Sequence, residues 1–407
     1  MPEIVLLSII IPVAAILLVF NIRRIIFTLA IFPASHKMKE AEEYEQAHLP
    51  DVLILVPCRD EAGMIADLCQ ALSQLDYPRE SLQVVLIDDA SIDGTGVMME
   101  QQATERPGWH VLRFSNNIGK ASALNIALAR FPFGEIVYIF DADHRPDAQV
   151  LKRAVPYFYA PRVAAVTGFT QVVNPLASPS AFYSTVESYT NQLVTIRAKD
   201  RLGLAPALLG SNCAYRREPL IASGGFRNGA FSEDSDLTVT FYRQGYRIRF
   251  AQEAVSYQQV PQSVGGYLKQ HIRWGRGLND VAKVHGLEIL TDRKLSLPLR
   301  LELLLFTAGY LDRLALMSAV LLMIPSYLIS STLFLLLLGI VLFSLVTPLV
   351  QIVAIFLKER FGMAMWLRLP LIPVFFALDI FAAIRAMLDT VLNQPRLWTK
   401  TRREELP

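Results

Sequence analysis

Long apolar stretches lie at both ends of the chain, and a region of mixed composition lies between them. Near the N-terminus, residues 4–20 are apolar without a charge, and residues 25–32 form a second apolar stretch. The C-terminal third contains three more, residues 297–324, 327–357 and 367–392. Stretches of about 17–25 apolar residues are long enough to cross a bilayer. We therefore predict three regions: a transmembrane anchor over residues 1–33, a central domain over residues 34–290, and interfacial and transmembrane helices with a short basic tail over residues 291–407.

The basic pair Arg23-Arg24 follows the first apolar stretch. A cleaved secretory signal carries its charges before the apolar core, so we interpret this stretch as a retained anchor. The positive-inside rule places its N-terminus outside the cell and the central domain in the cytoplasm. We expect an integral protein of the plasma membrane.

Charged residues interrupt the first and third C-terminal stretches. The first carries Arg300, Glu302, Asp312 and Arg313, so we predict that its front part lies in the interface. The third carries charges that are costly in lipid, Asp379, Arg385 and Asp389. Basic residues that prefer the cytoplasm follow the second stretch and fill the tail: Lys358, Arg360, Arg368, Arg396, Lys400, Arg402 and Arg403. Both groups lie inside the cell if the third stretch is interfacial or re-entrant.

The central domain alternates between β-like and helical patterns. Four short apolar runs, residues 52–56, 84–87, 109–114 and 136–140, are each followed by a turn or a helical pattern. Such alternation predicts an α/β fold, a mostly parallel sheet with helices on both faces. Polar clusters follow three of these runs, and the carboxyl ends of parallel strands share one edge of the sheet. The clusters therefore predict a single site. No glycine-rich dinucleotide or kinase loop follows any run.

Composition narrows the class of protein. The chain is 53% hydrophobic and 19% charged, and its net charge of +2 leaves no electrostatic footprint for nucleic acid. The three cysteines, Cys58, Cys69 and Cys213, match neither a zinc motif nor a disulfide framework. A reducing, cytosol-facing central domain fits this usage.

Asp141 and Asp143 flank one residue directly after the fourth run. Two carboxylates this close repel each other unless a cation lies between them. Mg²⁺ or Mn²⁺ takes oxygen ligands, and it would neutralise the charge on a departing nucleotide diphosphate. The neighbouring His144 is interpreted as a partly exposed turn residue rather than as a third ligand.

Further candidates for a nucleotide-sugar pocket follow the other strands. Pro57, Arg59 and Glu61 come at the end of the first run. Asp88-Asp89 ends the second, where Asp89 would either bind the base or ribose or cap a helix together with Asp93. Lys120 lies just inside a helix N-terminus, a position that favours anions.

Asp234 begins a predicted helix and is the candidate general base. A glycosyl transfer that inverts the configuration of the sugar needs one carboxylate to take the proton from the attacking hydroxyl. Glu233 beside Asp234 also fits the helix dipole. Gln270, Arg273 and Trp274 are spaced i, i+3 and i+4, so they share one helix face. Arg273 suits a diphosphate and Trp274 a sugar ring. The alternative for this face is an amphipathic membrane-surface helix with an interfacial tryptophan.

Taken together, these motifs resemble the inverting glycosyltransferase family 2, over about residues 51–277. Within it they resemble the membrane-embedded, processive type that includes cellulose, chitin, hyaluronan and poly-N-acetylglucosamine synthases. Ser232 replaces the usual threonine before Glu233-Asp234, and Ala90 the usual glycine after Asp88-Asp89. The resemblance implies a GT-A fold. It also implies that Glu61 and Asp89 contact the nucleotide and that Asp141 and Asp143 hold the metal and the diphosphate. Asp234 would be the base. Gln270, Arg273 and Trp274, together with Glu233, would contact the diphosphate and the acceptor.

We predict a membrane-bound, metal-dependent, inverting hexosyltransferase that moves a sugar from a UDP-sugar to a growing β-linked polysaccharide. The alternative is single addition to a membrane lipid, as in ceramide glucosyltransferases. A non-catalytic membrane subunit fits poorly with the intact carboxylate set. The few spans predict that any channel is either narrow or needs a second copy of the chain, and the candidate partners are a homo-oligomer or an accessory membrane subunit. Pocket shape rather than motifs sets the sugar, the nucleotide and the linkage.

Overall fold

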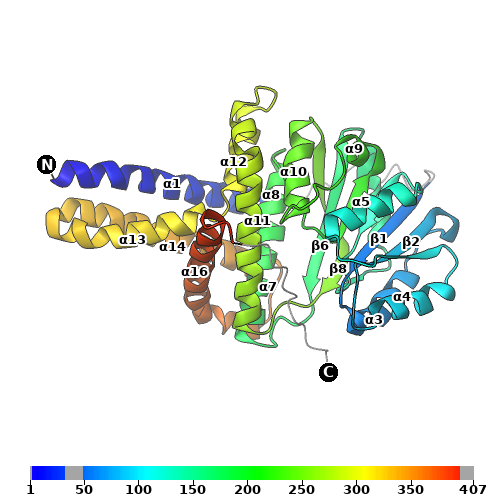
Figure 1. Ribbon diagram of the computed structural model, residues 1–407. Coiled ribbons are helices and arrows are strands. Elements are labelled where there is room, and N and C mark those ends of the chain that lie inside the picture. Colours follow the sequence, from blue (N-terminus) through cyan, green and yellow to red (C-terminus); the bar gives the residue numbers. More distant parts are fainter. Residues whose placement is uncertain (1, 33–48, 395–407) are drawn as a thin grey trace.

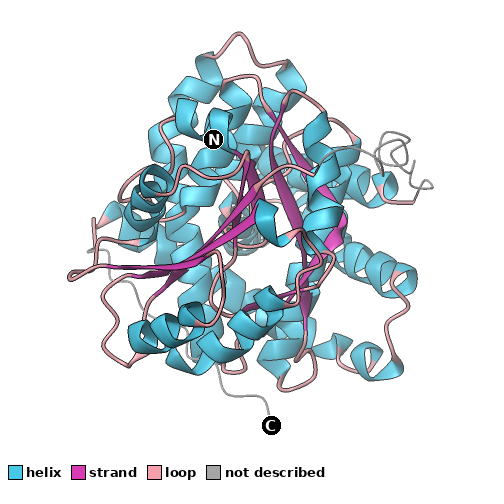
Figure 2. Cartoon of the chain, turned by 90° about the vertical axis from the view of Figure 1, so that its right-hand side faces the viewer, coloured by secondary structure: helices cyan, strands magenta, loops and turns pink. Residues whose placement is uncertain are grey.

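The computed structural model describes residues 2–32 and 49–394. A twisted sheet flanked by helices forms one part of the molecule, and long apolar helices project from it (Figure 1). Figure 2 shows helices on both sides of the strands. The basic tail residues Arg396, Lys400, Arg402 and Arg403 lie outside the described residues.

The four predicted runs form the first half of an eight-stranded sheet with the order β3-β2-β1-β4-β7-β6-β8-β5. They are β1 (Val52–Cys58), β2 (Leu82–Asp88), β3 (Trp109–Arg113) and β4 (Ile136–Ile139), and they pair in parallel. Alternate residues of β1 enter different cores, Leu53 and Leu55 on one face and Ile54 and Val56 on the other. Burial on both faces explains why these strands are continuously apolar rather than alternating. Three helices follow the first three strands, α3 (Ala62–Ser73), α4 (Thr95–Thr104) and α5 (Lys120–Arg130).

The second half of the sheet was not predicted from the sequence. It contains β5 (His144–Pro146), β6 (Val163–Val172), β7 (Cys213–Arg216) and β8 (Arg247–Gln258). β7 is antiparallel to both β4 and β6, and β5 is antiparallel to β8, whereas β6 and β8 are parallel. The sheet is therefore mixed but mostly parallel.

Further helices surround this half of the sheet. Those of the central domain are α6 (Val150–Ala154), α7 (Pro179–Tyr189), α8 (Arg197–Arg201), α9 (Arg217–Ala222), α10 (Glu233–Arg243) and α11 (Val264–Thr291). A π-helical segment, Thr190–Ile196, joins α7 to α8. Short 3-10 turns are Arg79–Ser81, Val155–Tyr159 and Leu369–Leu371.

Three long apolar helices form a packed bundle: α1 (Pro2–Ala30), α13 (Leu311–Ile329) and α14 (Ser331–Lys358). Their shared core includes Leu6, Ile10 and Leu17 of α1, Leu316 of α13 and Leu337 of α14. The two predicted N-terminal stretches are one continuous helix. Arg23 and Arg24, which separate the stretches in the sequence, do not interrupt this helix because carboxylates pair with them. The predicted stretch 297–324 is divided between α12 (Leu297–Thr307) and α13, which separates its front part from the span.

Carboxylates partner the charges at the inner end of the bundle. Arg23 contacts Glu302 at 2.7 Å, and Lys199 of α8 contacts the same carboxylate at 2.9 Å. Arg24 forms an ion pair with Asp312. Buried charges are tolerated only when they are paired in this way. These contacts therefore join the bundle to the central domain.

The last apolar stretch, Met363–Val391, is also long and apolar enough to cross a membrane. It contains α15 (Met363–Trp366) and α16 (Ile372–Val391). Figure 1 shows α16 beside α11 and across the direction of α1 and α13. The buried carboxylate of Asp379 accepts hydrogen bonds from Tyr183, at 2.8 Å, and from Tyr267. The Asp379 carboxylate of α16, which would be costly in lipid, therefore faces protein.

Candidate active site

The end of β2 positions the loop that opens α5. Both carboxylate oxygens of Asp89 accept backbone N–H groups, from Ile118 at 2.8 Å and from Gly119 at 2.9 Å. Asp88 accepts instead from Ser91 N–H at 2.9 Å and pairs with Arg113 at 3.2 Å. Asp89 therefore holds the backbone directly before Lys120, and its predicted contact with the nucleotide stays a prediction.

Asp93 is the residue that caps the helices α3 and α4 at this edge of the sheet. Its carboxylate accepts from Thr95 N–H at the start of α4 and from Ala62 N–H at the start of α3, both at 3.1 Å. The N–H of Glu61 donates to the Thr95 hydroxyl at 2.8 Å. Arg59 lies 3.9 Å from Asp60, and Pro57 lies within β1. Pro57, Arg59, Glu61 and Asp89 thus share the carboxyl edge of the sheet, as predicted.

Three potential metal donors gather after β4. One ligand atom each from Asp141, Asp143 and His144 lies within 4.8 Å of the other two. Asp143 also accepts a hydrogen bond from Gln258 Nε2 at 3.0 Å. The donor set fits Mn²⁺ or Mg²⁺ because two of its three members are carboxylates.

The prediction that His144 is partly exposed was wrong. Its side chain is buried at the start of β5, and Nδ1 lies 3.1 Å from the hydroxyl of Ser256. Pairing of β5 with β8 covers the turn, which the local sequence does not reveal. Burial lowers the pKa of His144 to about 4, so the imidazole is neutral at physiological pH. Neutral imidazole is the form that binds a metal ion.

Lys120 joins the two acidic motifs. Its Nζ lies 2.8 Å from Asp141 Oδ1, 3.0 Å from Glu233 Oε1 and 3.0 Å from the carbonyl oxygen of Gly210. Burial by itself lowers the pKa of Lys120, but the carboxylates of Asp141 and Glu233 outweigh burial and raise it. The ammonium group is therefore a permanent positive charge between the end of β4 and the start of α10.

Asp234 lies in the first turn of α10. Its Oδ1 accepts from the hydroxyl of Ser232 at 2.8 Å and from Ser235 N–H at 2.7 Å. Gly210 lies against the other oxygen, and a Cβ at Gly210 would stand 3.0 Å from Oδ2. With φ at +76°, Gly210 also has a backbone that other residues rarely adopt. The Gly210 loop therefore contacts both Asp234 and Lys120.

Activity should depend on the protonation of Asp234. Burial, and then the charge of Glu233, raise the pKa of Asp234 to about 6. A base must be deprotonated to work, so we expect kcat/KM, which reports the free enzyme, to be constant above this pKa and to fall about tenfold per pH unit below it. Initial rates between pH 4.5 and 8 at substrate concentrations well below KM would measure this. An acid limb centred near pH 4 would instead indicate an unshifted carboxyl group.

The predicted face of α11 lines the same cavity as the carboxylates. Gln270, Arg273 and Trp274 lie along the wall that contains Asp141 and Asp234. Trp274 remains 43% exposed. Gly277 brings α11 close to the start of α10, because a Cβ there would stand only 2.8 Å from the Cβ of Ser232. The cavity-lining position favours the acceptor interpretation of this face over a purely membrane-surface helix.

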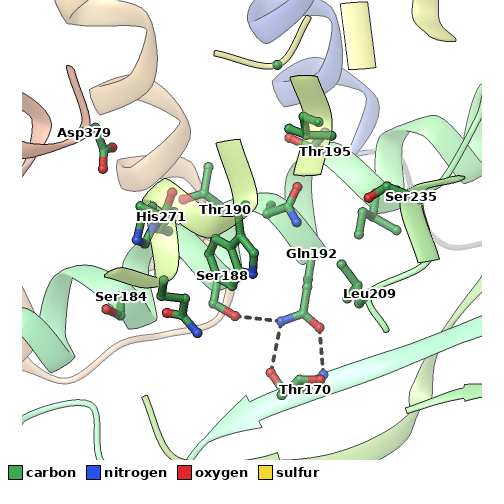
Figure 3. Close-up of a pocket in the computed structure, with 18 of the residues that line it drawn as sticks. Thr170, Ser184, Ser188, Thr190, Gln192, Thr195, Leu209, Ser235, His271 and Asp379 are labelled. Carbon is green, nitrogen blue, oxygen red and sulfur yellow. Dashed lines mark hydrogen bonds and ion pairs between the residues drawn. The ribbon is translucent and has the colours of Figure 1, made fainter. Parts of the chain in front are cut away.

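The cavity has a volume of about 560 Å³ and extends from the catalytic edge to the apolar helices. Lys120, Asp141, Glu233 and Asp234 line one end. The other end is lined by side chains of the membrane-facing helices: Phe20 and Phe27 of α1, Pro348 and Ile352 of α14, and Phe376 of α16. Polar side chains between the two ends are drawn in Figure 3. Sequence motifs did not identify this middle region, because its residues share no catalytic signature.

Fold and site together define a glycosyltransferase of the GT-A type with membrane-facing helices. A solved structure with this fold is the mannosyltransferase PcManGT from Pyrobaculum calidifontis in complex with GDP-Man and Mn²⁺. It has a TM-score of 0.64 and 23% identity, and the match covers 95% of this chain and 100% of that one. Residues 50–277 match the family described as "Glycosyltransferase like family 2", and the chain belongs to this family. The predicted family, fold and enzyme class, a glycosyltransferase, are confirmed.

Relatives within the family differ in their acceptors. The chain is 31% identical over 238 residues to a beta-monoglucosyldiacylglycerol synthase of Nostoc, and the match covers 57% of this chain and 50% of the relative. It is 25% identical over 240 residues to a poly-beta-1,6-N-acetyl-D-glucosamine synthase of Staphylococcus aureus, covering 57% and 56%. The chain therefore spans about half the length of these curated relatives, which include both a lipid glycosyltransferase and a polymer synthase.

Proposed function

We propose that this protein transfers one hexose, with inversion, from a nucleotide-diphosphate sugar to a hydroxyl group of a membrane acceptor. The observation that carries the proposal is the single cavity that joins Asp141 and Asp234 to the apolar helices. A UDP-sugar is the expected donor. Residues 34–290 would form the cytoplasmic catalytic domain, with the remaining regions holding it at the plasma membrane.

Each charged group of the site has a role in this proposal. Asp234 takes the proton from the acceptor hydroxyl, because its raised pKa makes it a better base than an ordinary aspartate. Lys120 and Arg273 face the diphosphate as cations, and Gln270 and Trp274 position the sugar and the acceptor. Pro57, Arg59, Glu61 and Asp89 surround the nucleoside. Asp141, Asp143 and His144 would hold Mn²⁺ or Mg²⁺, which when bound neutralises the leaving diphosphate.

The packing of the membrane helices favours a lipid acceptor. Leu6, Ile10, Ala319 and Leu337 are buried together between α1, α13 and α14. The bundle core is therefore filled along the outer part of α1, whereas the cavity reaches only the inner part of α1, at Phe20. An acceptor that enters sideways from the bilayer fits this arrangement. The growing polysaccharide remains the second candidate, since a second copy or an accessory subunit could supply a passage.

Sizing the product would test the acceptor. Purified protein in detergent micelles is incubated with radiolabelled UDP-sugars, Mn²⁺ and a lipid extract, and the products are separated by chromatography. We expect one labelled glycolipid with a β-linkage. High-molecular-weight material that is sensitive to glycosidases, without glycolipid, would support the polysaccharide candidate instead.

The same arrangement predicts a cytoplasmic C-terminus. With α1, α13 and α14 spanning and α16 lying at the interface, an outside N-terminus requires the tail to be inside. A C-terminal green fluorescent protein fusion should fluoresce, and a C-terminal alkaline phosphatase fusion should be inactive. Fusions after Arg24 and after Ser330 serve as inside and outside controls. An active phosphatase at the C-terminus would mean that α16 crosses the membrane.

A further inference from the structure

One helical stretch contributes six uncharged polar residues to the lining of the cavity, and four of them follow a helical spacing. These four are Ser184 and Ser188 of α7 and Asn191 and Thr195 of the π-helical segment, and all four line the cavity. We call them the polar strip. Their spacing of four, three and four residues is the repeat of a single helix face. Figure 3 shows three of them, Ser184, Ser188 and Thr195, around the opening.

The hydroxyl of Ser184 has no hydrogen-bond partner among the residues that the structure describes. The residue is 6% exposed, and its Oγ is buried. Its helical neighbours behave differently, since Thr185 and Thr190 each donate to the carbonyl four residues earlier, at 2.7 Å. That local bond is the usual solution for a hydroxyl in a helix. A buried hydroxyl left unsatisfied beside a cavity indicates a ligand that completes it.

Gln192 orients the hydroxyl of Ser188. The amide of Gln192 is fixed on the backbone of Thr170, by bonds of 2.7 Å and 3.1 Å, and its Nε2 also donates to Ser188 Oγ at 2.9 Å. Because Ser188 Oγ accepts this bond, its own proton can be donated to another group. The π-helical geometry that follows is a feature often found at functional sites.

Apart from Arg273, which the proposed function assigns to the diphosphate, the lysines and arginines that line the cavity are paired with carboxylates. Glu187 contacts His271 at 2.6 Å, and Lys199 contacts Glu302 at 2.9 Å. Arg23 and Arg24 pair with Glu302 and Asp312 as described above. A phosphate group would have to displace these carboxylates, whereas a neutral group would not. The chemistry of the strip therefore matches sugar or glycerol hydroxyls rather than a lipid phosphate.

We propose that the polar strip binds the hydroxyl groups of an uncharged acceptor headgroup. The proposal rests on the proposed function, because it names the chemical class of the membrane acceptor. The headgroup lies between the catalytic carboxylates and the apolar end of the cavity, where Phe20, Phe27 and Ile352 contact the lipid tails. The strip thereby presents one hydroxyl to Asp234 and excludes anionic lipids.

Replacement of Ser184 tests the strip. Ser184→Ala removes a hydroxyl that bonds to none of the described residues, so the melting temperature should stay the same or rise. We expect the KM for dioleoylglycerol or glucosyl-dioleoylglycerol in micelles to increase about three- to tenfold, the value of one hydrogen bond, with the donor KM unchanged. Thr185→Val is the matched control, because that hydroxyl bonds only within the helix; it should change neither KM. Undecaprenyl phosphate should be a poorer acceptor than the neutral lipids.

An unchanged acceptor KM in Ser184→Ala would overturn the proposal, as would undecaprenyl phosphate as the better acceptor. The proposed function can fail separately, if the wild-type protein binds donor but makes no glycolipid. In that event the affinity for glucosyl-dioleoylglycerol, measured by thermophoresis without donor, still tests the strip. Weaker binding by Ser184→Ala than by Thr185→Val would support it, and equal binding would refute it.

Discussion

Asp234→Asn should abolish sugar transfer while leaving donor binding intact. The amide is almost isosteric with the carboxylate and keeps the position at the start of α10, but it cannot accept a proton from the acceptor hydroxyl. General-base catalysis contributes about 10²–10⁴-fold, and we expect a loss of that size in kcat. The loss should appear equally in kcat/KM for the acceptor, because the proton is removed only in the transition state. Initial rates and donor titration by calorimetry measure the two effects.

Asp236→Asn, two residues further along α10 and on the opposite side of the helix, is the matched control. The Asp236 carboxylate pairs with Arg227 and with His285, at 3.0 Å for the latter, and these contacts hold α10 against α11. This variant should lower the melting temperature and leave kcat close to that of the wild type. If Asp234→Asn kept kcat within about threefold of the wild type, Asp234 would not be the base.

Asp143→Asn should weaken donor binding when Mn²⁺ is present. The carboxylate is one of three donors that converge after β4, and the substitution removes its negative charge and replaces one of its two oxygens by an amide nitrogen that cannot bind the ion. Even residues that only support metal ligands typically cost 10–100-fold on mutation, so we expect at least that reduction in metal-dependent donor affinity. Titration of the donor with Mn²⁺, and again with a chelator, separates this effect from direct contacts. The chelator should equalise the wild type and the variant.

Asp147→Asn provides a control close to the same turn. Asp147 accepts from Gln149 N–H at 3.0 Å and does not belong to the three-donor group. It should leave the Mn²⁺ dependence unchanged. Equal donor affinity for Asp143→Asn and the wild type with Mn²⁺ present would contradict a metal role. Together the two aspartates predict opposite patterns: one variant binds donor without turnover, and the other loses binding first.

The strands that carry the donor site could be predicted from the sequence because their own residues are mostly apolar, which indicates burial. β1 and β4 are apolar throughout, and β2 is apolar from Val84 to Ile87. Polar residues of the candidate site stand at or directly after the end of each of these strands. β7 has only four residues, and β8 mixes charged and apolar positions. Their place in the sheet depends on pairing with distant strands, which periodicity does not encode. The burial of His144 was missed for the same reason.

Contacts between residues of different motifs also could not be predicted from the sequence. Lys120 was predicted at a helix N-terminus, but nothing in its neighbourhood indicated that it bridges Asp141 and Glu233. Ser184 carries no motif, and its lack of a hydrogen bond is visible only once the helix and the cavity are in place. In contrast, Gln270, Arg273 and Trp274 were placed on one face by spacing alone, and that face does line the cavity.

The decisive measurement is a structure of the wild-type protein with Mn²⁺ and a non-hydrolysable UDP-sugar in a lipid nanodisc. We predict that the ion is ligated by Asp141 and Asp143 and that the diphosphate lies beside Lys120. We also predict that the Asp234 carboxylate faces the anomeric carbon from the side opposite the diphosphate, with the open cavity between that carbon and the bilayer. A diphosphate bound away from Asp141 and Asp143, or an anomeric carbon out of reach of Asp234, would contradict it.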